Sequence, residues 1–391
     1  YKETLHLIPY HSTMIHTLLL SSLLSTVIAD NELVFVQTLW RHGDRTPSST
    51  YPNDPYQQDF WGLPWGELTQ TGMQQQFALG DKLKSIYIDS YHLLNSTYYG
   101  DTMHLRSADK ARCVQSALSN MAGFFQSTPS TMASNVPNWP VGWFPIPVHT
   151  VPKKEDRELE PGEKCDKADD EMAKREAKKE YQNFLANNFN LFSLFNTYSG
   201  EAVTASYDTL HSFYSVLRIE KEFNNLTLPA WITDEVYDQL KAAVQASEDY
   251  IHGAAGFGED VDNTLIKLRG GFLLHEWRHN LKSAVEGQVL KYQPYSAHDN
   301  TIAALLMALE AKSDVVGEDT PHYASTLACE LWKTDEGYKV KFLFADDAYA
   351  PFRTITSNII GCIGVGDLCD YDTFYDASDK YSTDDDSKCD D

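Results

Sequence analysis

Apolar residues run almost unbroken through positions 33–40, which read Leu-Val-Phe-Val-Gln-Thr-Leu-Trp. A run this rich in β-branched and aromatic residues predicts a strand buried on both faces, as in a mainly parallel sheet. Apolar residues then recur at helical spacing within 69–87, which predicts an amphipathic helix. The residues on its apolar face are Met73, Phe77, Leu83 and Tyr87.

The same alternation follows once more. Positions 103–107 predict a second short strand, and the next apolar residues again recur at helical spacing. These residues are Val114, Ala117, Leu118, Met121 and Phe125. A strand followed by a helix, twice in succession, indicates α/β winding.

The middle of the chain has a different pattern, because it is dense in charges of both signs and rich in helix-like stretches. The helix-like stretches are 173–194, 233–252 and 270–284. Strand character returns later, at 289–296, 325–332 and 337–345, with a helical stretch at 302–309. We therefore predict an α/β fold in which 30–125 and 290–391 form a wound, mainly parallel central sheet flanked by helices. Residues 126–289 are predicted to form a mostly helical cap or insert.

The N-terminus resembles a targeting segment. An apolar stretch at 17–28 follows Met14 and ends before Ala29. An apolar run of about a dozen residues that ends in a small residue is typical of a signal peptide and is too short to span a bilayer. We interpret 1–29 as upstream residues and a signal peptide cleaved near Ala29, with a buried N-terminal helix as the alternative. Whether residues 1–13, before the first Met, are genuinely translated is left open.

Composition narrows the class of protein. The chain has 391 residues, of which 42% are hydrophobic and 23% charged, as in ordinary globular proteins. Its 32 Lys and Arg against 56 Asp and Glu give a net charge of -24. Such a chain repels phosphate backbones and anionic lipids, so we expect neither nucleic-acid nor membrane-surface partners. No second apolar stretch approaches membrane-spanning length, so no membrane anchor is expected. An anionic substrate would need positive charge gathered locally, which makes an Arg cluster informative.

Cysteines and glycosylation sequons agree with a secretory route. All six cysteines follow position 29, and an even number in a secreted protein suggests up to three disulfides, although 15 pairings are formally open. They are Cys113, Cys165, Cys329, Cys362, Cys369 and Cys389. Asn95 and Asn225 each begin an N-glycosylation sequon. The mature protein is expected to be secreted or to reach the lysosomal lumen.

The segment that carries the chemistry follows the first strand, where residues 41–47 read Arg-His-Gly-Asp-Arg-Thr-Pro. Ligands in wound α/β sheets bind just beyond the carboxyl ends of the strands. The forked guanidiniums of Arg41 and Arg45 match phosphate oxygens. The imidazole of His42, between them, is a recognised covalent nucleophile.

Two further segments point to the same site. Arg106, in the second predicted strand, is a candidate third guanidinium for the anion. His298 and Asp299 stand between a predicted strand and the helix that follows it. They supply a second imidazole and a carboxyl at the positive end of a helix dipole, which favours a bound phosphate.

Together these motifs resemble the histidine acid phosphatases, a branch of the histidine phosphatase superfamily marked by R-H-G-x-R-x-P and a later H-D. The resemblance to the prostatic and lysosomal types extends over essentially the whole mature chain. Further matching stretches are 68–80, 144–152, 225–229, 270–271 and 292–299.

The resemblance implies a role for each motif residue. His42 is the nucleophile that becomes a phosphohistidine, and Asp299 protonates the leaving alcohol. The phosphoryl oxygens are held by Arg41, Arg45, Arg106 and His298. No metal or other cofactor is implied, because guanidiniums supply the charge that phosphoryl transfer needs. The implied substrates are small-molecule or phosphoprotein monoesters, and a homodimer is left open.

The disulfide map departs from the family. Vertebrate members have a cysteine near positions 217–220, where this chain has none, so Cys113 looks additional and Cys329 lacks that partner. Cys362 and Cys369 flank a loop short enough to close locally. The resemblance suggests that Cys165 pairs with Cys389. The pairing of Cys113 with Cys329 is then predicted by elimination.

Three alternatives remain. His275, Glu276 and His279 match the H-E-x-x-H helix of zinc peptidases, but Lys282 and Val285 stand where the longer pattern needs Gly and His. A phytase or inositol-polyphosphate phosphatase of the same family usually needs a wider basic pocket, and the acidic composition weighs against it. A non-catalytic secreted binding protein on this fold would not require the nucleophile or the proton donor. The sequence does not identify the physiological substrate.

Overall fold

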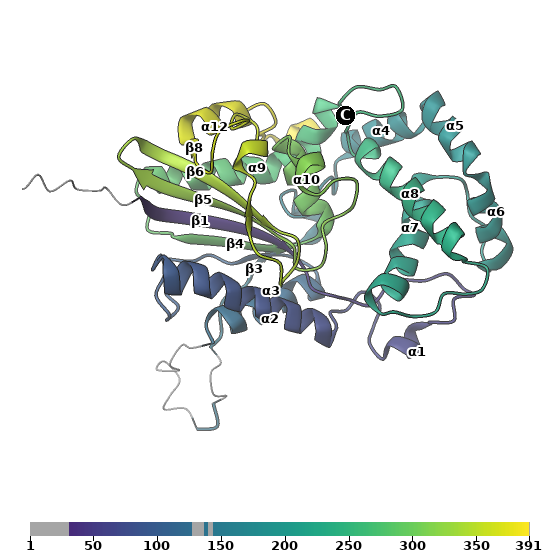
Figure 1. Ribbon diagram of the computed structural model, residues 1–391, viewed down its shortest axis with the longest axis horizontal. Helices are drawn as coiled ribbons and strands as arrows, with labels where there is room; N and C mark the ends of the chain where they lie inside the picture. Colours follow the sequence, from purple (N-terminus) through teal and green to yellow (C-terminus); the bar gives the residue numbers. More distant parts are fainter. Residues whose placement is uncertain (1–30, 127–136, 140–143, 391) are drawn as a thin grey trace, which may run out of the picture. The chain divides into compact units, whose positions relative to one another are not determined.

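The structure is a computed structural model that describes residues 31–126, 137–139 and 144–390 (Figure 1). The predicted signal peptide ending near Ala29 lies outside the described residues. Within the described part of the chain, no helix combines the length and apolar character needed to cross a membrane.

A mixed sheet forms the centre of the fold, with strand order β3-β2-β4-β1-β5-β6-β7 and β8 paired with β6. Its strands are β1 (Glu32–Arg41), β2 (Arg106–Ala108), β3 (His149–Val151), β4 (Tyr292–Ala297), β5 (Thr326–Thr334), β6 (Gly337–Ala345), β7 (Arg353–Thr354) and β8 (Cys369–Asp370). The pairs among β3, β2, β4 and β1 are parallel, whereas β5 to β8 pair antiparallel. The predicted α/β class is confirmed, and the sheet that was predicted to be mainly parallel is a mixed sheet with a parallel core.

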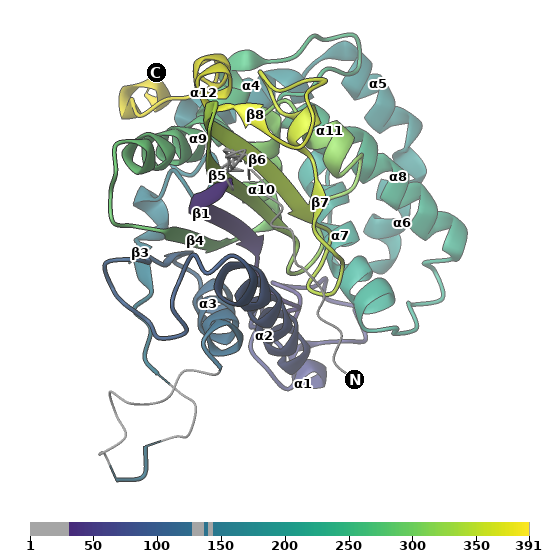
Figure 2. The same cartoon turned by 60° about the vertical axis from the view of Figure 1, so that its left-hand side comes forward.

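Helices cover both faces of this sheet (Figures 1 and 2). One face carries α2 (Gln70–Lys84), which continues into the π-helical turn η1 (Ser85–Ser90), and α3 (Ala111–Phe124). The other face carries α9 (Asn263–Val285), α10 (Asp299–Ala308) and α12 (Tyr371–Ser378). The short helices are α1 (Gln58–Trp61), α11 (Lys312–Val315), and the 3-10 turns η2 (Lys153–Glu155), η4 (Thr356–Asn358) and η5 (Asp386–Cys389).

The helices α2 and α3 lie where they were predicted, but part of their predicted apolar faces points outward. Met73 and Phe77 are each 42% exposed, and Leu118 is 44% exposed. The reason is a close backbone contact between the helices: a Cβ on Gly80 would lie 1.9 Å from the carbonyl oxygen of Asn120. Small and polar residues therefore occupy the contact between α2 and α3. Apolar periodicity alone does not identify the buried face of either helix correctly.

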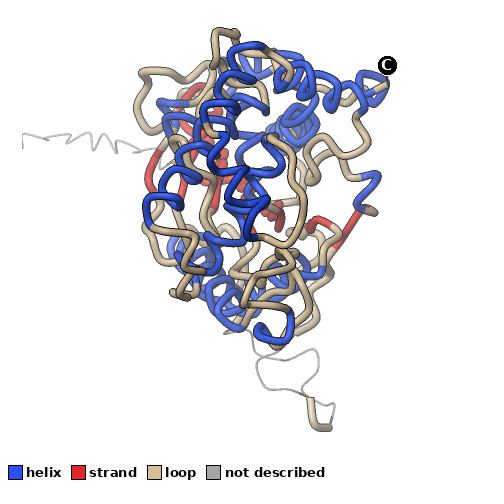
Figure 3. The backbone as a smooth tube through the Cα atoms, turned by 90° about the vertical axis from the view of Figure 1, so that its right-hand side faces the viewer, coloured by secondary structure: helices blue, strands red, loops and turns tan. Residues whose placement is uncertain are grey.

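A second group of helices has a core of its own. It consists of α4 (Asp166–Glu176), α5 (Lys179–Asn187), α6 (Phe189–Tyr198), α7 (Tyr207–Arg218) with the π-helical turn η3 (Ile219–Phe223), and α8 (Asp234–Ile251). Figure 3 looks onto these helices, which lie in front of the strands. Their core is rich in aromatic rings, and Phe195 stacks on Phe213 with centroids 4.0 Å apart. The longer helix α9 instead packs on β1 and α10, through residues such as Trp277.

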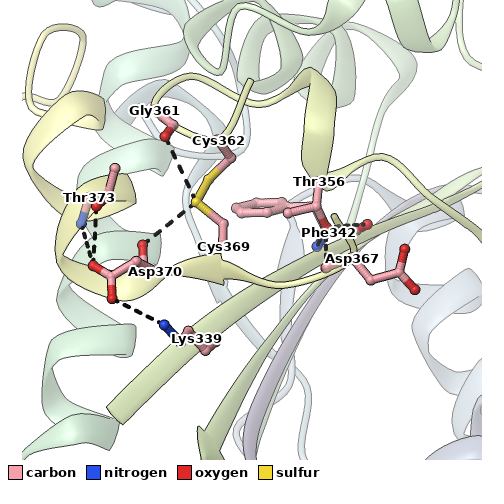
Figure 4. Close-up of a disulfide and its surroundings, with 9 residues drawn as sticks. All are labelled: Lys339, Phe342, Thr356, Gly361, Cys362, Asp367, Cys369, Asp370 and Thr373. Carbon is pink, nitrogen blue, oxygen red and sulfur yellow. Dashed lines mark hydrogen bonds and ion pairs between the residues drawn. A yellow bond between two sulfur atoms is a disulfide. The ribbon is translucent and has the colours of Figure 1, made fainter. Parts of the chain in front are cut away.

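Two predicted disulfides are confirmed. Cys165 pairs with Cys389, which joins the start of α4 to the C-terminal turn η5. Cys362 pairs with Cys369 and closes the loop before β8 (Figure 4). Next to that bond, the Asp370 carboxylate accepts a hydrogen bond from the Thr373 backbone N–H and so caps α12.

The prediction that Cys113 pairs with Cys329 is wrong, because both thiols are free and buried. The Cys113 Sγ lies 3.6 Å from the carbonyl oxygen of Ala297, at the end of β4. Cys329 lies on β5 opposite Gln37 of β1, which is itself opposite Gln293 of β4. The thiols are thus separated by roughly two strand spacings, about 10 Å, and by a further four residues along the strands. A disulfide does not span that separation.

Candidate active site

The sheet brings the two motif segments together. In the parallel pair of β1 and β4, Arg41 is in register with Ala297. The next residues, His42 and His298, therefore lie together at the carboxyl ends of the two strands. The turn after His42 is tight because it packs against the start of α2. A Cβ on Gly43 would lie 2.3 Å from the carbonyl oxygen of Gly72, so only glycine fits there.

The imidazole of His42 is held in one tautomer. Its Nδ1 lies 2.8 Å from the carbonyl oxygen of Gly43. A carbonyl only accepts hydrogen bonds, so Nδ1 carries the proton and Nε2 keeps a lone pair. Burial lowers the pKa of His42 well below its ordinary value, and the charges of Arg112 and Arg41 lower it further. The ring is therefore neutral, with an unprotonated nitrogen available for attack.

Three guanidiniums surround this imidazole. The Nε atoms of Arg41, Arg45 and Arg112 are buried and have no hydrogen-bond partner among the described residues. Arg41 is fixed by bonds of 2.6 Å to the Pro321 carbonyl oxygen and 3.0 Å to Asp299, and it stacks 4.2 Å above the ring of Tyr323. Charged N–H donors that lack a protein partner suit an oxyanion.

Arg106 does not belong to this group. In β2 it is in register with Tyr295, two residues before the end of β4. Its guanidinium pairs with Asp156 at 2.9 Å and with Glu158 at 2.7 Å. The third guanidinium is instead that of Arg112, in the first turn of α3. The sequence does contain a signal for Arg112: it lies at the N-terminus of the helix that follows β2, where anions bind.

The residues after β4 supply the second imidazole and the carboxyl. The ring of His298 lies 5.5 Å from that of His42, edge to face. Asp299 begins α10 and pairs with Arg41. Burial alone would raise the pKa of Asp299, but the charges of Arg41 and His298 hold it below its ordinary value. In the free protein Asp299 is therefore a carboxylate.

Two cavities meet at these residues. The first, of about 230 Å³, is lined by His42, Arg45, Lys110, Arg112, Lys153, Glu160, His298, Asp299 and Asn300. The second, of about 110 Å³, is walled by Arg41 and Arg45, by α7, η3 and α8, and by Tyr323. Its other lining residues include His211, Tyr214, Arg218, Phe223, Glu248 and Thr320, none of which a sequence motif indicated. Arg45 and Asp299 line both cavities, so the carboxyl lies between them.

The zinc-peptidase alternative finds no support in the structure. Glu276 lies 3.4 Å from Asn280 and 3.4 Å from Tyr295, and His275 contacts Ser382 and Asp384. Among residues 31–126, 137–139 and 144–390, no group of three His, Cys, Asp or Glu side chains is arranged to hold a metal ion.

Comparison with known proteins places this geometry in context. A model of the histidine phosphatase superfamily (branch 2) matches residues 32–345. The lysosomal acid phosphatase of Homo sapiens is 35% identical over 319 residues, which cover 81% of this chain and 71% of the relative. The prostatic acid phosphatase of Rattus norvegicus is 31% identical over 345 residues, or 88% of this chain and 86% of the relative.

Solved structures show the same fold at lower identity. The apo phytase of Hafnia alvei matches with a TM-score of 0.65 and 17% sequence identity. The match covers 92% of this chain and 98% of the phytase chain. The multiple inositol polyphosphate phosphatase of Bifidobacterium longum, in complex with inositol hexasulfate, matches with a TM-score of 0.58 and 13% identity. That match covers 86% of this chain and 90% of the phosphatase. At such identities the likeness concerns the fold alone.

Proposed function

Because the chain belongs to the histidine phosphatase superfamily, branch 2, we propose that it hydrolyses phosphate monoesters through a covalent phosphohistidine at His42. It is an acid phosphatase of the lysosomal and prostatic type. The observation that carries the proposal is the neutral ring of His42, whose free nitrogen lies among three guanidiniums with unpaired donors.

The first step transfers the phosphoryl group to the protein. The guanidiniums of Arg41, Arg45 and Arg112 bind the phosphoryl oxygens, with His298 beside them. The Nε2 of His42 attacks phosphorus, so a P–N bond forms as the bond from phosphorus to the ester oxygen breaks. Bound phosphate raises the pKa of Asp299, so the carboxyl is protonated in the complex at acid pH. The departing oxygen takes this proton and leaves as the alcohol.

The second step restores the protein. Water attacks the phosphohistidine and gives a proton to the Asp299 carboxylate, while the P–N bond breaks and inorganic phosphate is released. His42 returns to its neutral form. Positioning and charge stabilisation account for most of the catalysis in such a reaction, so side chains suffice for it.

The cavity beside α7 is the proposed place for the leaving alcohol. It starts at Asp299, where the ester oxygen must be protonated, and continues past the rings of Tyr214, Phe223 and Tyr323. These aromatic walls favour an organic group over bulk water. We propose small-molecule or phosphoprotein monoesters as substrates.

A second candidate, an inositol-polyphosphate phosphatase, is favoured by one observation. Lys110 and Lys153 add positive charge to the cavity that holds Arg112. The Glu160 carboxylate in the same wall opposes that charge, so we rank this candidate below a general monoesterase.

The cellular route also follows from the residues. Two disulfides and the lysosomal and prostatic relatives indicate a protein of the secretory pathway. Asn95 and Asn225 are exposed, which agrees with their proposed glycosylation. We propose that the protein is secreted or delivered to the lysosomal lumen after cleavage near Ala29.

Arg112 and Arg106 are expected to respond very differently to substitution. Arg112→Ala should lower kcat/KM by about 10²–10³-fold, because it removes a donor to the developing negative charge. Arg106→Ala should retain most of the activity but lower Tm, because it leaves the buried Asp156 without its cation. Steady-state rates and thermal melts of both variants give the answer. A large loss of activity in Arg106→Ala, with none in Arg112→Ala, would show that Arg106 and not Arg112 is the third phosphate-binding arginine.

Release of phosphate from a panel of monoesters tests the function itself. Nitrophenyl phosphate, phosphotyrosine, an alkyl phosphate and phytate should be compared at acid pH, with and without EDTA. We expect hydrolysis of the first three, and no effect of EDTA, because guanidiniums supply the positive charge. Activity lost on chelation and restored by zinc would contradict the metal-free mechanism. Hydrolysis of phytate alone would favour the second candidate.

A further inference from the structure

The ring of His298 contacts a buried carboxylate that the two steps above do not use. The Oε1 of Glu160 lies 3.2 Å from the Nε2 of His298, and both side chains are less than a tenth exposed. We propose that Glu160 is a positioning residue for the phosphatase reaction: its carboxylate fixes the His298 ring beside His42 and keeps that ring cationic. This inference rests on the proposed function of the site.

The loop that carries Glu160 is tied to the helix that carries His298. The Thr301 hydroxyl accepts a hydrogen bond from the backbone N–H of His298 at 3.3 Å. The same hydroxyl donates to the carbonyl oxygen of Leu159 at 2.8 Å. Thr301 thus links the residue before Glu160 to the first residue of the motif. The separation of carboxylate and ring is therefore set by the fold and not by two mobile side chains.

A second side chain packs on the same ring without replacing the carboxylate. The Cys113 Sγ lies 3.7 Å from both Nδ1 and Nε2 of His298. Being equally far from the two nitrogens, the sulfur points at neither of them. Of the two side chains, only Glu160 places an oxygen within ordinary hydrogen-bond distance of an imidazole nitrogen.

The charges of the pair support one another. Burial alone would lower the pKa of His298, but Cys113 and Glu160 raise it to about 9. Burial would raise the pKa of Glu160, but His298 and Lys153 hold it below its ordinary value. Both partners are consequently ionised at acid pH, and the cationic ring of His298 lines the cavity that holds His42 and Arg112.

The other groups around the ring keep a constant charge over most of the useful pH range. His42 stays neutral, and Asp299 stays ionised in the free protein. The remaining groups are Arg45 and Arg112, and the amines of Lys110 and Lys153. Guanidiniums do not titrate in this range, and amines ordinarily do so only near its upper end. A difference between the natural protein and a Glu160 variant in the pH at which affinity for anions falls therefore reports on His298.

Sulfate binding, measured by isothermal titration calorimetry, tests the proposal. Sulfate remains a dianion from about pH 5 to about pH 10, so a change in its Kd reflects the protein. In the natural protein, Kd should rise with a midpoint near pH 9, where His298 loses its proton. In Glu160→Gln, the midpoint should fall by about one to three pH units, because the opposite charge is gone.

Two further variants make the result specific. Glu163→Gln is the matched control, because Glu163 lies in the same loop and pairs with Lys153 at 2.7 Å. Its midpoint should equal that of the natural protein. Glu160→Asp withdraws the carboxylate by one methylene and should give an intermediate midpoint, which keeps the test usable if Glu160→Gln does not fold.

Two outcomes overturn the proposal. One is an unchanged midpoint in Glu160→Gln, or in Glu160→Asp where only that variant folds. The other is a Kd lowered equally at every pH, which would mean that Glu160 only repels anions. Sulfate binding needs no turnover, so a shifted midpoint in a protein without phosphatase activity would contradict the proposed function and leave only the pairing of Glu160 with His298 in the anion site.

Discussion

Replacing His42 with alanine is expected to lower kcat by about 10³-fold or more, because the covalent route disappears. KM should change much less, since Arg41, Arg45 and Arg112 remain to bind the phosphate. Initial rates with nitrophenyl phosphate at acid pH measure both quantities. His149→Ala, an exposed histidine on β3, is the control and should keep the activity of the natural protein.

A different result would place the chemistry elsewhere. If His42→Ala retained about a tenth or more of the natural rate, the loss would be too small for the removal of a nucleophile. The nucleophile would then have to be another group. Loss of activity through unfolding is separated by circular dichroism, since the buried ring of His42 also contacts His298 and Tyr323.

Replacing Asp299 with asparagine is expected to give a loss that depends on the leaving group. An alkyl phosphate, whose alkoxide cannot leave unprotonated, should lose about 10²–10⁴-fold in kcat. Nitrophenyl phosphate should lose far less, because nitrophenolate departs without a proton. Asparagine keeps the shape of the side chain beside Arg41, so the comparison isolates the proton.

The pH dependence of the natural protein gives a second readout. In the free protein Arg41 and His298 hold the pKa of Asp299 below its ordinary value, against the effect of burial. Bound phosphate adds a like charge and draws on the same guanidinium, which raises the pKa in the complex. As pH rises, Asp299 ionises and the rate with an alkyl phosphate should fall, which gives an optimum on the acid side. His42 is neutral throughout, so it adds no loss until strongly acid pH.

Equal losses on both substrates would contradict this role. Asp299 would then act by orienting Arg41 or the phosphate, and the proton donor would have to be sought among the other residues of the two cavities.

Much of the site is predictable because strand, turn and chemistry occur in one segment. The apolar run at 33–40 is the buried strand β1, and the residues that follow it carry His42 and two guanidiniums. The strand β4 and the start of α10 repeat this arrangement for His298 and Asp299. Since parallel strands end at the same edge, two local patterns suffice to predict one site.

The residues that escaped prediction depend on register and on long-range contacts. Arg106 opens β2 instead of closing it, and its side chain meets Asp156, so Arg112 takes the predicted role. The strands and loops that pack on a short strand decide which of its side chains face the ligand. Those contacts cannot be predicted from the residues of the strand alone. Glu160 lies in a segment without periodicity, and contacts distant in sequence bring its loop to the site, such as the bond from the Thr301 hydroxyl to the Leu159 carbonyl.

The central claim is a covalent bond between phosphorus and His42, and trapping that intermediate tests it most directly. The protein should be mixed with nitrophenyl phosphate and denatured within the time of one turnover. Digestion at alkaline pH and mass spectrometry then locate the phosphate. We predict an acid-labile, base-stable phosphate on the peptide that contains His42, absent from His42→Ala. Phosphate on any other residue, or none while the natural protein shows a burst of nitrophenol, would contradict the account.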